Sequence, residues 1–326
     1  MRSSIFMGSM AFLALNTACT CTDPCCDEGF EVVKQSYVHK YGVEVDPVSW
    51  NERGGHGQVV TTQKNGVTIN QNYVDGVLQG DTTYSFPHST AVEKVATYDK
   101  GTLVSETVYF RSAGQKMMTE YTPSRPDYLI ITQWYENGAQ RSRETFINDR
   151  IDEGYYYDMK GQVESSVTAG SGDRYERNDS GELLSSDKYV NGEVVETTYY
   201  YPHKSLKEVI PYANGTIHGM RKFYFVGGDP DRFEEWTNGR QTGTTIMFQH
   251  GEKIAEVPYV NGMKSGLEKR YRDGEFVVEE VTWVDGKQHG PHTTYIGSES
   301  TVDWFYNDKR MTKTQFDRMA IPQIRT

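Results

Sequence analysis

Apolar and polar residues alternate along most of the chain in short runs, and each run ends at a turn that usually contains glycine. Val281 and Trp283 fall on one face of such a run, whereas Glu280 falls on the other. A period of two residues between glycine turns predicts β-strands joined by hairpins. We therefore expect β-hairpins over residues 57–310.

The turns recur with a regular period. From Gly192 onward, one class of turn repeats at steps of 23, 24, 23 and 24 residues, with an aromatic residue three places before each turn. The turn positions of this first class are Gly76, Gly101, Asp149, Gly192, Gly215, Gly239, Gly262 and Gly286, and the aromatic residues are Tyr73, Tyr98, Phe146, Tyr189, Tyr212, Trp236, Tyr259 and Trp283. Such a period indicates one supersecondary unit per repeat, stacked into an extended array.

A second class of turn falls midway between the first-class turns. Its glycines are Gly66, Gly114, Gly138, Gly161, Gly181, Gly251 and Gly274, and it is degenerate at residues 86–88, 201–203 and 226–229. The two classes together give about eleven hairpin units. At two strands per unit and about 4.8 Å per strand, the array is on the order of 100 Å long.

The residues in the turns suit hairpins. Six turns contain Asn-Gly, as at Gly66, Gly138 and Gly262, and three contain Asp-Gly, as at Gly286. Asn and Gly tolerate positive φ, so these pairs predict two-residue hairpin turns. In four consecutive units a second glycine follows the turn glycine by four places, as Gly266 follows Gly262. The residues one and five places after this second glycine are Met220/Tyr224, Thr244/Phe248, Leu267/Tyr271 and Pro291/Tyr295. They share one face of the strand, and we expect this face to pack between neighbouring units.

The pattern YxNGxxxGxxxxYxxG, clearest over residues 189–295, resembles the MORN repeat and more closely its variant in the family labelled toxin–antitoxin system YwqK-family antitoxin. The resemblance implies a curved, elongated and twisted antiparallel sheet. The fold class expected is therefore all-β: an elongated, twisted antiparallel sheet of about eleven stacked hairpins, capped by a short N-terminal helix and the C-terminal tail.

Composition narrows the class of partner. The chain has 23 tyrosines but only 36% hydrophobic residues, a mixture that suits half-buried strands better than a thick aliphatic core. Its net charge is −11, whereas sequence-independent binding of nucleic acids depends on clusters of Lys and Arg. We therefore expect no nucleic-acid partner.

The first residues resemble a bacterial lipoprotein signal. Arg2 precedes an apolar stretch over residues 5–15, which is too short to span a bilayer but fits a secretory signal, and Cys19 follows small residues. The prediction is a signal peptide over 1–18, lipid attachment at Cys19 and a Cys-rich tether over 19–29. Cleavage without lipid, leaving the four cysteines to form disulfides, is an alternative, and a cysteine metal cluster is another.

Both ends of the array are expected to be capped. Phe30, Val33 and Tyr37 recur at helical spacing, which predicts a helix within residues 27–41 and an N-terminal cap over 30–56. The basic tail, residues 311–326, either caps the last hairpin as a helix or docks on an acidic surface.

No catalytic, cofactor or metal site is predicted. His289 and His292 could suggest a metal, but His289 stands at a variable turn position. The pairs Glu234–Glu235 and Glu279–Glu280 could suggest acid–base chemistry, but adjacent strand residues point to opposite faces, which predicts solvated positions.

The function predicted is a non-enzymatic binding or scaffold protein at the cell envelope, anchored to a membrane through its N-terminal lipid and offering an extended surface to a protein partner. One alternative is an antitoxin-like intracellular regulator. Another is an envelope-polymer hydrolase, which would require the irregular loops at 86–91, 122–128, 170–174 and 226–232 to converge on one site.

Overall fold

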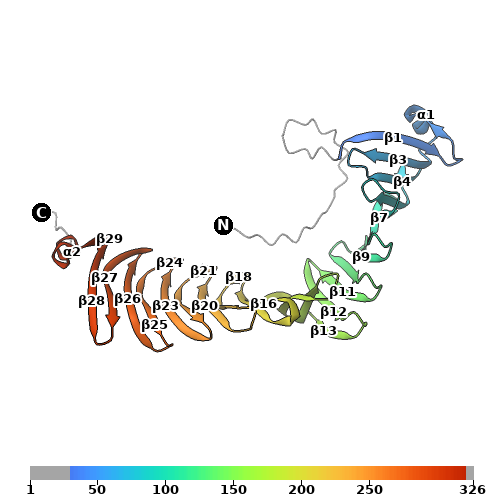
Figure 1. Ribbon diagram of the computed structural model, residues 1–326. Coiled ribbons are helices and arrows are strands. Elements are labelled where there is room, and N and C mark those ends of the chain that lie inside the picture. Colours follow the sequence, from blue (N-terminus) through green and yellow to red (C-terminus); the bar gives the residue numbers. More distant parts are fainter. Residues whose placement is uncertain (1–29, 321–326) are drawn as a thin grey trace.

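Almost every long strand pairs with the strand that follows it in the chain, so the strands build one antiparallel meander. The computed structural model describes residues 30–320 and contains one sheet of 29 strands, which is not closed. The sheet forms an elongated, bent array with α1 at one end and α2 at the other (Figure 1). The expected elongated all-β fold is confirmed.

The elements have the following bounds. The first part of the sheet contains β1 (Val32–His39), β2 (Glu44–Val45), α1 (Pro47–Glu52), β3 (Gly57–Gln63), β4 (Thr68–Val74), β5 (Val77–Leu78), β6 (Gly80–Ser85), β7 (Val92–Asp99), β8 (Thr102–Tyr109) and β9 (Gln115–Tyr121). The middle contains β10 (Tyr128–Trp134), β11 (Gln140–Ile147), β12 (Arg150–Tyr157), β13 (Val163–Thr168), β14 (Ser171–Arg177), β15 (Leu183–Val190), β16 (Glu193–Tyr200), a 3₁₀ turn (Pro202–Lys204), β17 (Leu206–Ala213), β18 (Thr216–Ile217) and β19 (Gly219–Tyr224). The last part contains β20 (Pro230–Thr237), β21 (Arg240–Gln241), β22 (Gly243–Gln249), β23 (Glu252–Val260), β24 (Met263–Lys264), β25 (Gly266–Arg272), β26 (Phe276–Val284), β27 (Lys287–Ile296), β28 (Glu299–Tyr306), β29 (Lys309–Met311) and α2 (Lys313–Ala320).

Most second-class turns differ from first-class turns in backbone conformation, although those at Gly251 and Gly274 have positive φ at both central residues, as first-class turns do. First-class turns have positive φ at both central residues, as at Asn261 (51°) and Gly262 (82°), which is the two-residue turn predicted. At Gly138 only the glycine has positive φ, and its amide donates to the carbonyl of Tyr135 at 2.9 Å, while the Asn137 side chain accepts from the Ala139 amide. The two-residue turn predicted at Gly138 is therefore wrong, and Gly66 has the same wider turn.

First-class turns are stacked by backbone hydrogen bonds. At most first-class turns the amide of the glycine donates to a carbonyl of the preceding unit, as from Gly239 to Ile217 (2.9 Å) and from Gly262 to Gln241 (2.8 Å). Four of the accepting carbonyls end a two-residue strand (β5, β18, β21 or β24), whereas those of Gly55 and Gly170 lie outside strands. The bonds tie one edge of the array together independently of side chains.

In seven units a second glycine, placed after the turn, lies directly opposite an aromatic residue on the next long strand. All seven of these glycines have positive φ. The pairs are Gly57–Tyr73, Gly80–Tyr98, Gly172–Tyr189, Gly219–Trp236, Gly243–Tyr259, Gly266–Trp283 and Gly290–Phe305. The glycine is needed for its positive φ and for close neighbours other than the ring, such as Pro258 beside Gly266 and Glu235 beside Gly243.

The N-terminal cap differs from the prediction. The helix expected within 27–41 is wrong, because Val32–His39 forms β1 and pairs along its length with β3. The helix is α1 instead, where Asp46 accepts from the amides of Val48 and Ser49 and Pro47 takes the first helical position. Residues 27–29 lie outside the described range. The buried Trp50 of α1 packs against the rings of Tyr37 and Tyr73.

The C-terminal tail caps the last hairpin, which is one of the two arrangements predicted for it. Lys309–Met311 forms β29 at the sheet edge, and α2 follows. Phe316 of α2 packs on the rings of Trp304, Tyr306 and His289, with centroids 5.1–6.2 Å away.

We predict that Gly266→Ala lowers the free energy of unfolding by about 1–3 kcal/mol, because alanine is strained at positive φ. The φ of Gly266 is 118°, and a Cβ there would lie 3.1 Å from Cγ of Pro258. The midpoint of urea denaturation, followed by circular dichroism, measures the loss. Gly114→Ala is the control, because φ there is not positive and the nearest atoms lie 4.0 Å away; an equal loss in both variants would contradict the explanation.

Candidate functional site

The predicted lipid-attachment residue, Cys19, lies outside residues 30–320, as do the other three cysteines, so the structure does not place them. Among the described residues, the features that bear on function are the two faces of the sheet and the groove at its C-terminal end.

One face of the sheet is packed. The register places a row of side chains next to one another across successive strands of the C-terminal half, and we call the side that carries this row the packed face. Its buried members there are Thr197, Ile210, Glu234, Thr245, Val257, Glu268 and Val281. A half-buried aromatic row runs beside it, formed by Tyr212, Trp236, Tyr259, Trp283 and Phe305. In a single-layer sheet these side chains are covered mainly by neighbours on the same face.

The packed face buries carboxylates as ion pairs. Glu144 is 2% exposed and accepts hydrogen bonds from Oη of Tyr156 (2.8 Å) and Nε of Arg174 (2.6 Å). Burial, and after it the charge of Glu144, raises the pKa of Tyr156, so its hydroxyl stays protonated and donates. The three groups satisfy one another, which indicates a structural role rather than a catalytic one.

Glu268 and Glu234 repeat this arrangement further along the face. Burial opposes ionisation of Glu268, but the hydrogen bonds and charges of Lys264 and Arg270 outweigh it and lower the pKa of the carboxyl. Glu234 accepts from Nε of Arg232 (2.8 Å) and Nε1 of Trp236 (2.9 Å).

The solvated position predicted for Glu234 is therefore wrong, although its neighbour Glu235 is exposed. The burial of these carboxylates was not predicted from the sequence, although their positions in the repeat indicate it. The packed row holds the residue two places after the second glycine, such as Glu268, and the residue two places before the aromatic, such as Glu234.

The two histidines do not converge on a metal. The ring of His289 packs against Tyr306 and Phe316 and is half-buried, so the solvated turn position predicted for it is wrong. His292 Nε2 lies 2.7 Å from a carboxylate oxygen of Glu279. Within residues 30–320, no group of three or more His, Cys, Asp or Glu side chains could hold a metal ion.

The four irregular loops are spread along the array. Those at 86–91 and 226–232 lie at the edge of second-class turns, where Phe86 and Phe225 begin closed turns. Those at 122–128 and 170–174 lie at the opposite edge, where the Asp127 and Gly170 carbonyls accept from the following first-class turns. The loops therefore do not come together at one place.

The other face is the more exposed one, and we call it the exposed face. It carries the column predicted to pack between units, including Met220, Leu267 and Tyr295, all of which are exposed. The expectation that this column packs holds in part: Tyr224 and Phe248 are half-buried, and their rings lie 6.0 and 4.9 Å from that of Phe233 on the strand between them, whereas Met220, Leu267 and Tyr295 are exposed. Leu267 is 43% exposed, and Phe276 at a nearby turn is also exposed. Exposed apolar side chains on the same face of several units form a surface that suits a protein partner.

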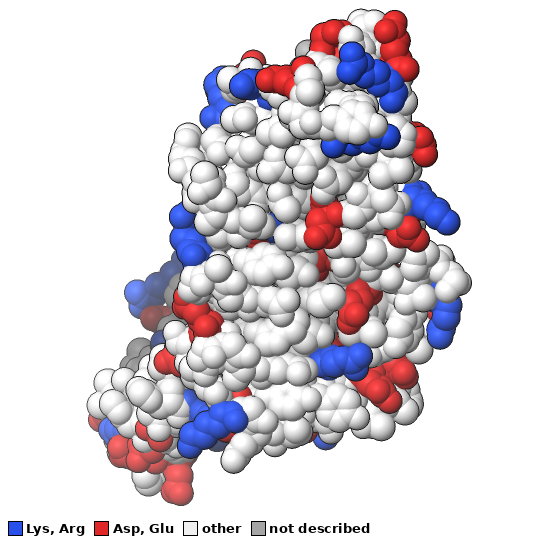
Figure 2. Space-filling model, turned by 90° about the vertical axis from the view of Figure 1, so that its right-hand side faces the viewer, with Lys and Arg blue, Asp and Glu red and all other residues white. Residues whose placement is uncertain are grey.

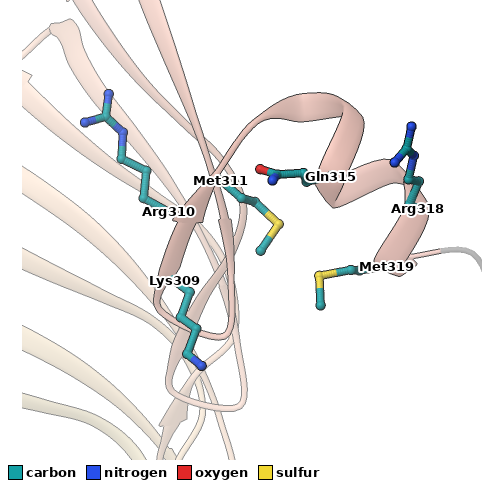
Figure 3. Close-up of a pocket in the computed structure, with 6 residues that line it drawn as sticks. All are labelled: Lys309, Arg310, Met311, Gln315, Arg318 and Met319. Carbon is teal, nitrogen blue, oxygen red and sulfur yellow. The ribbon is translucent and has the colours of Figure 1, made fainter.

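A groove lies between β29 and α2 at the C-terminal end (Figure 3). This C-terminal groove has a volume of about 410 Å³ and is lined by Lys309, Arg310, Met311, Gln315, Arg318 and Met319. A second hollow of about 550 Å³ shares Arg310, Met311 and Gln315 with it and extends to Val302 and Trp304. The lining therefore combines cations with thioether and aromatic side chains.

Charges of both signs are dispersed over the face shown in Figure 2, with broad uncharged areas between them. No long basic stripe, of the kind that tracks a phosphate backbone, crosses the face in this view. Neither helix of residues 30–320 is long and apolar enough to cross a membrane.

Comparisons with known proteins leave the family open. No protein-family model matches the sequence, and no curated protein matches it. The structure of a point mutant of S. aureus TarM, in complex with fondaparinux, alpha-GlcNAc-glycerol and UDP, is 6% identical with a TM-score of 0.18, over 39% of this chain and 21% of TarM. This chain thus spans about a fifth of TarM.

Two further structures are equally distant. A porin-like protein from Bacteroides uniformis is 12% identical with a TM-score of 0.15, over 86% of this chain and 93% of its own. The TcdB2–TccC3–Cdc42 structure has 12% identity and a TM-score of 0.13, over 77% of this chain and 18% of its own. Likeness at this level carries no argument about function, and the MORN-variant resemblance stays a prediction.

We predict that Glu144→Ala lowers the free energy of unfolding by about 1–3 kcal/mol, because the buried hydroxyl of Tyr156 loses its acceptor. Arg174 loses its nearest carboxylate but keeps Glu176 and Asp187, each 3.6 Å away. The control is Glu193→Ala, which breaks an exposed pair with Arg150 and costs about 0–1 kcal/mol. Urea denaturation of both variants measures the difference. Equal losses of unfolding free energy in the two variants would contradict the prediction that the buried carboxylate stabilises the fold more than an exposed one.

Proposed function

We propose that this chain is an exported, lipid-anchored β-repeat protein whose exposed face binds a protein partner at the cell envelope. The observation that carries the binding function is the set of exposed apolar side chains on one face in three of the last four units, Met220, Leu267 and Tyr295. The opposite face is occupied by its own ion pairs and aromatic rings and offers fewer free groups.

Export and anchoring rest on the sequence before the array, where an apolar stretch precedes Cys19. The wide separation of the four irregular loops supports binding over hydrolysis, because a hydrolase needs several groups within reach of one bond. The buried carboxylates also favour binding over hydrolysis, because each already accepts hydrogen bonds from partners within the sheet.

We expect cells fed radiolabelled palmitate to label the full chain and not the Cys19→Ala variant. The label should fractionate with membranes, because a thioether-linked lipid holds the N-terminus there. Full-length, unlabelled protein in the cytosol would refute the export proposal and favour an intracellular regulator.

The binding face is testable with a photo-crosslinking phenylalanine analogue in place of Leu267, which lies on the exposed face. Met247 is the matched control, because it lies on the packed face and is similarly exposed, at 37% against 43% for Leu267. In intact cells, we expect a discrete adduct from position 267, identified by mass spectrometry, and none from position 247. Adducts from 247 alone would place the partner on the wrong face.

A further inference from the structure

Four Asn-Gly turns of the array share one conformation. The pairs are Asn191–Gly192, Asn214–Gly215, Asn238–Gly239 and Asn261–Gly262. Both residues of each pair have positive φ, and each asparagine is exposed. The other two Asn-Gly pairs differ, because the side-chain oxygens of Asn65 and Asn137 accept from the backbone amide two residues further on.

An asparagine followed by glycine can lose its side-chain amide without an enzyme. The backbone nitrogen of the glycine attacks Cγ of the asparagine, and the Cγ–Nδ2 bond breaks. The proton given up by the attacking nitrogen leaves with Nδ2 as ammonia. Water then opens the five-membered imide ring, which yields aspartate when the new bond to Cγ breaks and isoaspartate when the original peptide bond breaks. Glycine favours the attack because no Cβ shields its nitrogen.

A hydrogen bond from the attacking nitrogen opposes this reaction, because the amide must leave its acceptor before it attacks. Three of the four turns have such a bond. The amide of Gly192 donates to the carbonyl of Gly170 at 2.7 Å, and the amides of Gly239 and Gly262 donate to carbonyls at 2.9 and 2.8 Å. The amide of Gly215 has no backbone acceptor among residues 30–320.

The reason lies in the unit that precedes Gly215. The acceptors for Gly239 and Gly262 end the two-residue strands β18 and β21, which lie along one edge of the array (Figure 1). The strand before Gly215, β16, instead runs without a break from Glu193 to Tyr200 and contains no glycine. The chain therefore does not leave the ladder there to offer a carbonyl to the next turn.

We propose that Asn214 is the asparagine that deamidates first in the folded protein, with water as the only co-reactant. Aspartate fits this turn, because Asp75–Gly76 and Asp285–Gly286 have the same pair of positive φ angles. Isoaspartate does not fit, because its main chain runs through Cβ and Cγ and adds one carbon to a two-residue turn. The modification therefore loosens the hairpin of β17 and β18. The proposal does not rest on the proposed function.

Incubation of the folded chain at mildly alkaline pH, followed by protease digestion and mass spectrometry, tests the proposal with the other three turns as internal controls. We expect position 214 to convert about fivefold faster than positions 191, 238 and 261, the factor that a hydrogen bond of about 1 kcal/mol gives. Circular dichroism confirms that the chain stays folded.

The same measurement on the urea-denatured chain separates the fold from the local sequence. There the four positions should convert at similar rates, because the hydrogen bonds are lost and each asparagine is still followed by glycine. Similar rates at the four positions of the folded chain would overturn the proposal. So would faster conversion at 191, 238 or 261, or an advantage of 214 that persists unchanged in urea.

Asn214→Asp is the matched variant for the effect on the turn, since it adds the charge without the extra main-chain carbon. We expect the chain that carries isoaspartate at 214 to unfold at a lower urea concentration than the fresh chain. Asn214→Asp should unfold at the same concentration as the fresh chain. Equal midpoints for all three would contradict the expected loosening of the hairpin.

Discussion

The register that sets a positive-φ glycine opposite an aromatic residue on the neighbouring strand is the constraint on which the array depends. A one-layer sheet has no second layer to cover its aromatic rings, so each ring is covered mainly by neighbours on the same face. Opposite Trp283 and Tyr259 stand Gly266 and Gly243, both with positive φ. The ring and the glycine belong to successive units, so neither unit completes the contact alone. This fixes the repeat length, since insertion of one residue would move the ring to the other face.

Much of this could be predicted from the sequence because the determinants are local. Turn glycines, the preceding aromatic and the alternation of strand residues fixed the strands and the period. The turn type at Gly138 could not be predicted from Asn-Gly alone, because it depends on whether the Asn137 side chain accepts a backbone amide. The expected N-terminal helix failed for a longer-range reason: β3 supplies a strand partner for Val32–His39, which outweighs the helical spacing of its apolar residues.

The amino-acid composition also could not predict which face of the sheet is packed. Both faces carry apolar and aromatic side chains, and only the cross-strand register shows that Val257, Glu268 and Val281 lie side by side. From the sequence alone, a glutamate on a strand is predicted to be solvated, because the cations that would pair with it when buried are not known. Here Arg270, two residues further along β25, and Lys264, four residues earlier on β24, both reach Glu268, and the long stems of such cations also cover apolar surface. The candidate site was therefore less predictable than the fold.

The proposed anchor constrains where the exposed face can act. Residues 19–29 span at most about 40 Å when fully extended, which is well below the array length of about 100 Å. If Cys19 carries the proposed lipid, β1 stays close to the membrane and the C-terminal end of the array can extend away from it. An array that lies along the membrane would leave a partner access only to the side that faces away from the lipid. An array that stands away from the membrane would instead carry its exposed face outward, where a partner can reach every unit.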